Sequence, residues 1–360
     1  MSLRVAATVE SAWHRVPGGV ANATHHSLRA VATDPDIELV GVHAWHRTAP
    51  VEGLAPVIPT SAIPLPRPVL YECWHRSRRP GVRRWTGPVD VVHATSAVIP
   101  PPSGAELVAT VHDLAFLDRP DHSTTRGVRL ARRGFELARD EATLVVVPSA
   151  ATRAECVAAG IDAERIRLVP WGCRPTPVTD TDRARVRNRY SLPTSFILWV
   201  GTLEPRKNLD GLLAAHRAVP GVPLVVVGPA GWGDVDLPVS DRVVQLGFVP
   251  DADLAPLYDL ATVFALPSHA EGFGMPVLEA MAQGAAVVTS TGTATEEVIG
   301  DTGVTVIPGD VEALADALVS LLDDEPKRTR LGAAARERAG AFTWERTGLL
   351  LADVYREAVA

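Results

Sequence analysis

Short apolar runs typical of buried strands alternate with helix-length segments along the whole chain, and this alternation constrains the fold more than any other feature. The runs are LRVAATVE, IELVGVHAW, VDVVHATS, LVATVHDLAF, ATLVVVPS and IRLVPWGC, followed by SFILWVG, VPLVVVG, VVQLGFV, TVFALP, AAVVTS and GVTVIP. Strands separated by helices of ten or more residues favour parallel sheets covered by helices on both faces. The sequence therefore predicts an α/β fold with two doubly wound parallel sheets.

The alternation is interrupted once, at residues 173–182, where CRPTPVTDTD has the composition of a linker. A chain of 360 residues is long for one domain and sufficient for two. We therefore expect one domain over residues 1–176 and another over residues 177–343. The remaining segment, residues 344–360, needs a partner already built, because it carries an apolar helical stripe at Leu349, Leu350, Val354 and Tyr355.

Charge and cysteine content exclude several classes of function. The net charge is −7, to which residues 1–176 contribute +3 and the rest −10, and an acidic chain lacks the basic footprint of a nucleic-acid-binding protein. There is neither a run of about 18 apolar residues nor a signal-peptide core before Glu10. Three cysteines without a CxxC pair suit a reducing cytoplasm and argue against structural zinc. We expect a cytoplasmic protein with no membrane span.

Two segments of the first half leave alternatives open. The segment Tyr71–Trp85 contains five arginines and two tryptophans. These residue types suit an acceptor or the inner face of a membrane, although a solvated arginine-rich helix face is favoured. The proline-rich segment Pro50–Pro68 predicts a surface loop.

Two positions of the first half lie where a parallel sheet gathers ligands. Gly18 and Gly19 precede a helix expected from Ala21 to Ala32, and they allow either a close backbone approach to a ligand or a plain tight turn. His112 closes the run LVATVH at the expected carboxyl end of a strand. A structural and a functional role are equally open for this histidine.

The segment HAEGFGMPVLEAMAQG, residues 269–284, follows the buried run TVFALP and contains the strongest local signal of the chain. Pro276 stands where a first helical residue is expected, which places Glu271 on the preceding loop and Glu279 on the first turn. Backbone N–H groups of Gly274 to Val277 would then be unpaired and could seat a phosphate. Carboxylates on both sides suit the hydroxyl groups of a nucleotide diphosphate sugar.

Two adjacent cations follow the first strand of the second half. In GTLEPRKN, Gly201 ends the strand, Arg206 and Lys207 lie on the loop, and Asn208 is expected to cap the next helix. In a parallel sheet this loop can lie beside the one that carries Glu271. Fixed cations there can stabilise a diphosphate leaving group, whereas the alternative is an exposed ion pair of Arg206 with Glu204.

Acidic pairs of the D-x-D type could hold a divalent cation, but none closes a hydrophobic strand. The four pairs are Asp34 and Asp36 at a proline turn, Asp180 and Asp182 in the linker, Asp234 and Asp236 in a Gly-rich loop, and Asp251 and Asp253, the first of them expected as a helix cap. We therefore expect chemistry without a metal or other cofactor.

The segments GTLEPRKNLDGLL, LVVVGPAGWG and HAEGFGMPVLEAMAQGAAVVTS resemble the signature blocks of family-four (group 1) glycosyltransferases of the GT-B fold. The resemblance includes an E-x7-E motif at Glu271 and Glu279, and it covers the first half more loosely through the GG loop, TVHDL and VVPSAATRAE. It implies two Rossmann-like domains with a cleft between them, an acceptor-side N-terminal domain and a donor-binding C-terminal one. It also implies that the last helix, residues 344–360, crosses back to complete the first domain.

The resemblance assigns roles within this site. It implies that Glu271 contacts the transferred sugar, that Glu279 contacts the ribose, and that Arg206 and Lys207 contact the diphosphate. His112 would lie near the reacting face of the sugar. The remaining donor-binding positions are Gly19, Gly201, Thr202, Phe273, Gly274, Met275, Pro276 and Val277.

The expected reaction is retaining, metal-independent transfer of a sugar to a hydroxyl of a saccharide, lipid-linked or small-molecule acceptor. The wording HDLAF and EGFGMP favours GDP-mannose and leaves UDP-sugars open. Alternatives on the same fold are a non-catalytic nucleotide-sugar-binding protein and a nucleotide-sugar epimerase. A phosphorylase would need a cofactor lysine, and the chain has only Lys207 and Lys327.

Overall fold

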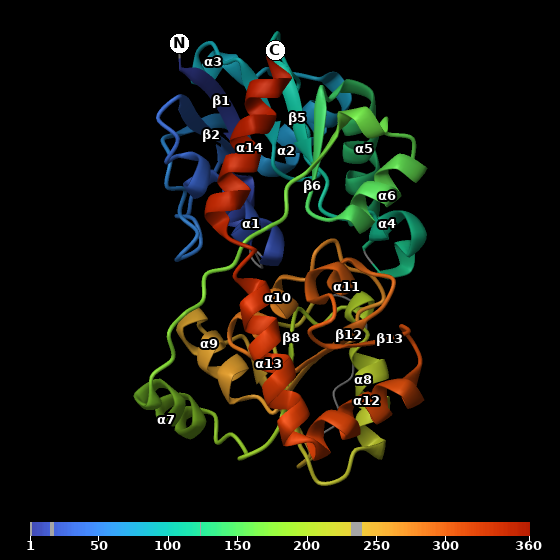
Figure 1. Cartoon of the computed structure of the whole chain (residues 1–360). Coiled ribbons are helices and arrows are strands. Elements are labelled where there is room, and N and C mark those ends of the chain that lie inside the picture. Colours follow the sequence, from blue (N-terminus) through green and yellow to red (C-terminus); the bar gives the residue numbers. More distant parts are fainter. Residues whose placement is uncertain (1, 15–17, 123, 232–239) are drawn as a thin grey trace. The chain divides into compact units, whose positions relative to one another are not determined.

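The computed structural model describes residues 2–14, 18–122, 124–231 and 240–360 (Figure 1). The chain divides into two compact units. Unit 1 comprises Met1–Gly172 and Thr343–Ala360, and unit 2 comprises Cys173–Phe342. Each unit contains one parallel sheet with helices around it, so the predicted α/β class with two Rossmann-like sheets is confirmed.

Unit 1 has a seven-stranded sheet in the order β3-β2-β1-β4-β5-β6-β7. Its strands are β1 Leu3–Thr8, β2 Ile37–Trp45, β3 Thr60–Pro66, β4 Val91–Ala94, β5 Glu106–Thr110, β6 Leu144–Val147 and β7 Ile166–Leu168. Its helices are α1 Gly18–Val31, α2 Arg67–Glu72, α3 Arg83–Thr86, α4 Ala115–Asp118, α5 Thr125–Glu141, α6 Ala150–Ala158 and α14 Trp344–Ala358. The strand order reverses at β1 and β4, which is where open α/β sheets bind ligands.

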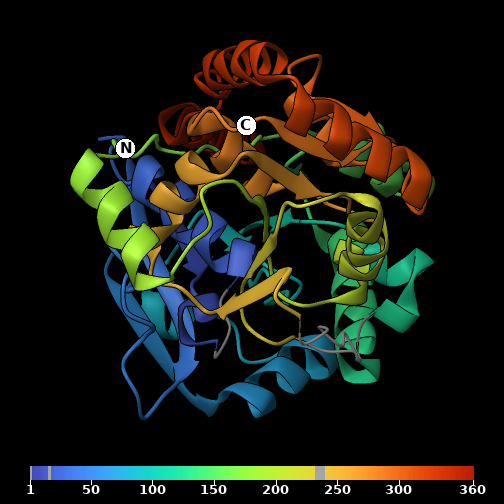
Figure 2. The same cartoon turned by 90° about the horizontal axis from the view of Figure 1, so that it is seen from below.

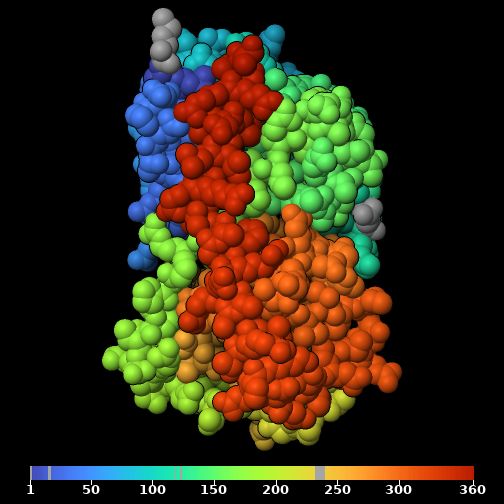
Figure 3. Space-filling model, viewed as in Figure 1, coloured from blue at the N-terminus to red at the C-terminus, as the bar shows by residue number. Residues whose placement is uncertain are grey.

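Alternate residues of β1 point into two separate apolar cores, as a strand buried on both faces requires. Val5 and Ala7 face a core that includes Tyr355 of α14, whereas Ala6 faces the core on the other side. Helix α14 packs beside α1, and a Cβ on Gly348 would lie 2.6 Å from the Cβ of Ala30. The last helix therefore completes unit 1, as predicted, and its surface is visible in red in Figure 3.

The buried stripe of α14 differs from the predicted one. Leu349 is 66% exposed, and Leu350 is only partly buried. The buried apolar side chains of α14 are Trp344, Leu351, Ala352, Val354, Tyr355 and Ala358. The prediction was wrong at Leu349, because the apolar cluster LLL fits more than one helical stripe and packing against α1 selects among them.

The proline-rich segment contains a strand and not only a loop. Residues 60–66 form β3, which pairs in parallel with β2 at the edge of the sheet. An edge strand tolerates Pro64 and Pro66, because one side of it makes no ladder hydrogen bonds. Composition alone could not reveal this strand.

The segment Tyr71–Trp85 is not one solvated helix. It includes the end of α2, a turn of π-helix at Cys73–Ser77 and the short helix α3. Trp74 is 2% exposed and donates through Nε1 to the carbonyl of Pro80. Arg78 turns inward to the carbonyls of Trp74 and Ile99. Part of the segment therefore belongs to the core of unit 1, although Arg76, Arg79 and Arg84 are exposed.

Unit 2 has a six-stranded parallel sheet in the order β10-β9-β8-β11-β12-β13. Its strands are β8 Ile197–Val200, β9 Leu224–Val227, β10 Val243–Gly247, β11 Val263–Leu266, β12 Val287–Ser290 and β13 Val304–Val306. Its helices are α7 Asp180–Arg189, α8 Leu209–Ala218, α9 Asp251–Leu260, α10 Met275–Ala282, α11 Ala294–Ile299, α12 Val311–Asp323 and α13 Glu325–Ala339. Helix α8 packs beside α12, and α10 beside α13 (Figure 2).

The expected linker is shorter than predicted, because α7 begins at Asp180. Thr179 and Asp182 form a capping box at its start, which the polar composition of the segment concealed. Within the described ranges, no helix is both long and apolar enough to cross a bilayer.

Candidate active site

The loops after β8 and β11 lie side by side at the carboxyl edge of the unit 2 sheet. The two strands are neighbours and run in parallel, with Ile197 opposite Val263 and Leu198 opposite Phe264. The loop after β8 ends in a 3-10 turn at Pro205–Lys207, and the loop after β11 leads to α10. The predicted proximity of Arg206 and Lys207 to Glu271 is therefore confirmed by the sheet itself.

Glu271 lies at the centre of a compact set of charge-assisted hydrogen bonds. Lys207 Nζ donates to Glu271 Oε1 over 3.0 Å, and Arg206 Nη1 donates to Oε2 over 3.1 Å. Ser268 Oγ also donates to Oε1, over 2.9 Å. Three donors thus fix both oxygens of one carboxylate, which sets the positions of the two cations as well.

These groups are largely buried, and burial makes their interaction strong. The exposed fractions of the side chains are 8% for Glu271, 10% for Lys207 and 19% for Arg206. Burial raises the pKa of Glu271, but the charges of Lys207 and Arg206 outweigh burial and bring the pKa to about 2. Arg206 also pairs with Glu204 over 3.5 Å, as the alternative interpretation expected. This ion pair is not an exposed one, because the Glu204 side chain is only 8% accessible.

The backbone of the first loop is shaped for this arrangement. A Cβ on Gly201 would lie 2.7 Å from Cδ of Lys207, so glycine makes room for the lysine stem. Asn208 has a φ of 52° and makes no side-chain cap, contrary to the prediction. Its Nδ2 donates instead to the carbonyl of Pro267 over 2.9 Å. This bond ties the loop after β8 to the loop after β11. Thr202, another predicted position, directly follows Gly201 just beyond the end of β8.

The start of α10 has the open form that a ligand site needs, with one correction. Gly274 has a φ of 97°, which strongly favours glycine, and no side chain caps the helix. Val277 N–H was predicted to be unpaired, but it donates to the Gly274 carbonyl over 2.9 Å. Pro276 is the second helical residue and has no N–H. Gly274 and Met275 are thus the predicted positions that retain a backbone donor for a ligand.

The aromatic ring of Phe273 is buried just before this helix. Phe273 is 2% exposed, and its ring lies edge-on to Phe342 with centroids 6.0 Å apart. Met275 is 9% exposed. Both side chains therefore contribute to packing. The backbone atoms of Phe273 and Met275 are the parts that a nucleotide-sugar donor could contact.

Glu279 was predicted on the first turn of α10 but lies beyond that turn, because the helix already begins at Met275. Glu279 has a partner that the sequence did not indicate. Tyr258 OH of α9 donates to Glu279 Oε2 over 2.9 Å. Burial raises the pKa of Glu279 to about 7, although the hydrogen bond from Tyr258 acts in the opposite direction. The two carboxylates of the E-x7-E motif thus have opposite behaviour, because Glu271 has two adjacent cations and Glu279 has a neutral hydroxyl.

The other predicted residues, His112 and Gly19, belong to unit 1. His112 Nε2 lies 2.8 Å from the carbonyl of Thr95, which can only accept, so Nε2 carries the hydrogen. Burial lowers the pKa of His112, and Nδ1 has no hydrogen-bond partner among the described residues. The neutral ring therefore has one buried acceptor available. Gly19 lies in the first turn of α1, which begins at Gly18 and not at Ala21. No atom of the described residues lies within 4 Å of the place where a Cβ on Gly19 would stand.

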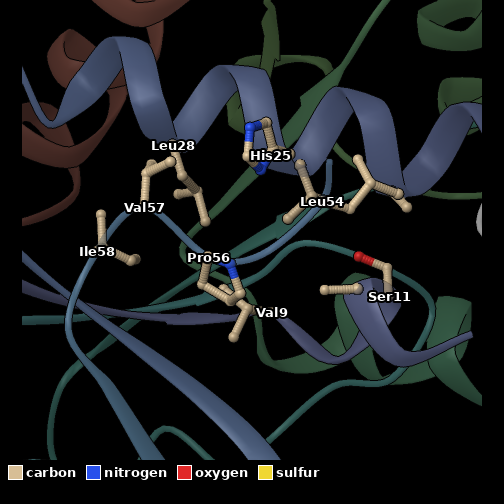
Figure 4. Close-up of a pocket in the computed structure, with 11 residues that line it drawn as sticks. Val9, Ser11, His25, Leu28, Leu54, Pro56, Val57 and Ile58 are labelled. Atoms are coloured by element: carbon tan, nitrogen blue, oxygen red, sulfur yellow. The ribbon is translucent and has the colours of Figure 1, made fainter. Parts of the chain in front are cut away.

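His112 lines a small pocket of unit 1. That pocket also contains His93, Thr110 and Trp171. His93 bridges Tyr355 OH, 2.7 Å from its Nδ1, and Thr110 Oγ1, 2.8 Å from its Nε2. Another pocket of unit 1 is mainly apolar, and its lining includes His25 of α1 together with Leu54, Pro56, Val57 and Ile58 (Figure 4). It contains none of the predicted site residues.

The acidic pairs considered for metal binding have other roles where they are described. Asp34 pairs with Arg356, and Asp182 accepts from the backbone N–H of Thr179 in the capping box of α7. Asp251 was predicted to cap α9, but it is the first helical residue, and Pro250 occupies the N-cap position. Asp253 accepts from Arg185 and Tyr190, while Asp234 and Asp236 lie outside the described residues. In the part of the chain that is described, no three His, Cys, Asp or Glu side chains cluster as metal ligands.

Comparisons with known proteins agree with this architecture. Residues 180–338 match the family described as glycosyl transferases group 1, and residues 17–176 match Glycosyltransferase Family 4. The O-antigen chain mannosyltransferase B of Escherichia coli is 33% identical over 265 residues, which are 69% of this chain and 70% of that protein. The MMP alpha-(1->4)-mannosyltransferase of Mycolicibacterium hassiacum is 33% identical over 303 residues, covering 76% and 72%. Some longer E. coli mannosyltransferases also match, and the chain spans 22% of their length.

Solved structures resemble the whole chain in fold. The HepE protein of Anabaena, crystallised with UDP and glucose, superimposes with a TM-score of 0.77. The match covers 99% of this chain and 100% of that one at 20% sequence identity. At this identity the likeness concerns the fold.

Proposed function

The chain belongs to the glycosyl transferases group 1 family, and from this membership we propose that it transfers a mannosyl group from GDP-mannose to a hydroxyl of a glycan acceptor. The transfer retains the configuration of the anomeric carbon and needs no metal ion. The mannosyltransferases among the relatives support mannose as the transferred sugar. The Anabaena protein was crystallised with UDP, so UDP-sugars are the second class of donor to test.

The observation that carries the proposal is the pair of cations fixed at the carboxyl edge of the unit 2 sheet. Arg206 and Lys207 are already oriented by Glu271, so no reorganisation is needed when negative charge develops on a leaving diphosphate. The uncapped start of α10 adds backbone donors at the same edge. Fixed positive groups of this kind can take the place of a divalent cation in stabilising the departing phosphate.

The state of Glu271 favours a reaction without a covalent intermediate. Three donors occupy its oxygens, and its pKa is about 2, so the carboxylate is a poor nucleophile. We therefore propose attack by the acceptor hydroxyl on the face from which the phosphate leaves. The bond from the anomeric carbon to the phosphate oxygen breaks, and a bond to the acceptor oxygen forms on the same face. The hydroxyl proton passes to the departing phosphate oxygen.

The proposal also divides the roles between the units. Unit 2 holds the donor, with Glu279 meeting the ribose and Glu271 the sugar. Unit 1 binds the acceptor and supplies His112, whose neutral Nδ1 can accept a hydrogen bond from a sugar hydroxyl.

A donor panel tests the proposal directly. The chain is incubated with GDP-mannose, UDP-glucose, UDP-galactose or dTDP-glucose and a mannose oligosaccharide, with and without EDTA, and the product is examined by NMR. We expect an α-linked mannosyl product from GDP-mannose, at equal rates with and without EDTA. A β-linked product would contradict retention, loss of turnover in EDTA would contradict metal independence, and a mannose-labelled Glu271 would contradict the direct mechanism.

A further inference from the structure

Glu279 is held by a buried tyrosine that belongs to a different helix. Tyr258 lies in α9 and is 2% exposed, and its hydroxyl donates to Glu279 Oε2 over 2.9 Å. Its ring lies edge-on to Phe264 of β11, with the centroids 5.4 Å apart. Packing on the strand therefore fixes the ring, and the ring fixes the hydroxyl. The position of one carboxylate oxygen of Glu279 follows from the core of unit 2.

Only one oxygen of Glu279 is used in this way. In the described parts of the chain, no group donates a hydrogen bond to Oε1 of Glu279. A carboxylate oxygen accepts two hydrogen bonds, so Oε1 and the second lone pair of Oε2 remain for a ligand. The two neighbouring hydroxyls of a ribose are donors with a spacing that suits one carboxylate.

We propose that Tyr258 is the positioning residue of Glu279, and that its hydroxyl holds Oε2 so that the carboxylate faces both ribose hydroxyls of the nucleotide. This inference rests on the proposed function, because a ribose reaches Glu279 only if unit 2 binds a nucleotide sugar. Tyr258 itself is buried and does not touch the ligand. Its contribution is to fix the direction and the charge of the group that does.

The charge of Glu279 depends on several groups that face it from different elements. Burial raises its pKa to about 7, the Tyr258 hydroxyl lowers it, Asp251 of α9 raises it, and Lys207 lowers it. Three other titratable or charged groups lie on neighbouring segments. They are Cys173, whose pKa is raised by burial and then by Glu279, Arg336 of α13, which donates to the carbonyl of Gln283, and Glu296 of α11, which accepts from Thr291. Of these groups, Tyr258 is the one that donates a hydrogen bond to the carboxylate.

Removal of the hydroxyl has a consequence that a packing defect does not have. In Tyr258→Phe the ring and its contact with Phe264 remain, but the charged form of Glu279 loses a donor. The pKa of Glu279 then rises further, and at pH 7 more of the carboxyl is protonated. A protonated carboxyl is a weaker acceptor for ribose hydroxyls, whereas at pH 9 the carboxylate is restored.

The test compares Tyr258→Phe with Tyr190→Phe. Tyr190 OH donates to Asp253 Oδ2 over 2.6 Å, so the control removes another tyrosine–carboxylate bond that involves α9. GDP and UDP are titrated by calorimetry at pH 7 and pH 9. For Tyr258→Phe we expect affinity about tenfold lower than wild type at pH 7, with a smaller loss at pH 9. Tyr190→Phe should bind like the wild type at both pH values.

A second measurement follows the carboxyl directly. In protein with ¹³C-labelled glutamate, the Glu279 signal is assigned with Glu279→Gln, and its titration midpoint should be higher in Tyr258→Phe than in wild type. Three results would overturn this inference but not the proposed function, provided that the wild-type chain binds nucleotide. They are unchanged nucleotide affinity in Tyr258→Phe, an equal loss of affinity at pH 7 and pH 9, and an unchanged titration midpoint of Glu279. Failure of the wild-type chain to bind either nucleotide would instead overturn the proposed function and the ribose role with it.

Discussion

The substitution Glu271→Gln tests how strongly the buried cations depend on one carboxylate. A pKa of about 2 in place of the ordinary 4.5 corresponds to about 3 kcal/mol of stabilisation of the folded protein at pH 7. Glutamine keeps the shape but removes the charge, and Lys207 stays buried without it. We therefore expect Glu271→Gln to lower the free energy of unfolding of unit 2 by about 3 kcal/mol, in the range for breaking a buried ion pair.

The pH dependence gives the prediction its sign. The pKa of Glu271 is lowered by folding, so its stabilisation is complete above the unfolded pKa near 4.5 and disappears as the pH falls toward 2. The difference between wild type and variant should shrink to about 1 kcal/mol at pH 3. Urea unfolding followed by tryptophan fluorescence measures it, because Trp199 of β8 is completely buried in unit 2.

A matched control in the same unit is Asp259→Asn. Asp259 accepts two hydrogen bonds from Arg183, but the Arg183 side chain is 39% exposed, so the expected loss is below about 1 kcal/mol. A loss below about 1 kcal/mol for Glu271→Gln at pH 7 would refute the reasoning. So would a loss of the same size at pH 3.

Three further predictions concern the site and its supports. Arg206→Ala or Lys207→Ala should each raise the transition-state barrier by about 2 to 4 kcal/mol, and wild-type kcat/KM in either would remove that residue from the site. Gly274→Ala should lower the free energy of unfolding by about 1 to 3 kcal/mol, because φ is 97° and the new Cβ would lie 2.5 Å from a threonine methyl group; an unchanged Tm would contradict this. Tyr355→Phe should cost about 1 to 3 kcal/mol in thermal unfolding, since it leaves Nδ1 of His93 without its partner, and it should leave the nucleotide affinity of unit 2 unchanged.

The parts of the site that the sequence predicted were those fixed by the parallel sheet. Apolar strand runs and helix lengths determine that β8 and β11 share a carboxyl edge, so the sequence alone places Arg206 and Lys207 near Glu271. Family motifs then identified the chain as a glycosyltransferase, and the matches to both halves confirm this family.

The remaining features depend on packing between elements that are distant in sequence. Tyr258 stands 21 residues before Glu279, and only the packing of α9 beside α10 brings the two together. Asn208 looked like a helix cap, but its left-handed backbone turns the side chain to Pro267. The exposure of Leu349 likewise follows from how α14 lies on α1.

The central claim is that unit 2 binds a nucleotide diphosphate sugar through fixed cationic side chains. Calorimetric titration of the chain with GDP-mannose in EDTA, beside the Lys207→Ala variant, measures this most directly. We predict saturable binding at one site per chain, weakened at least tenfold in Lys207→Ala. Absence of binding to GDP-mannose and to UDP- and dTDP-sugars, or equal affinity in the variant, would contradict the claim.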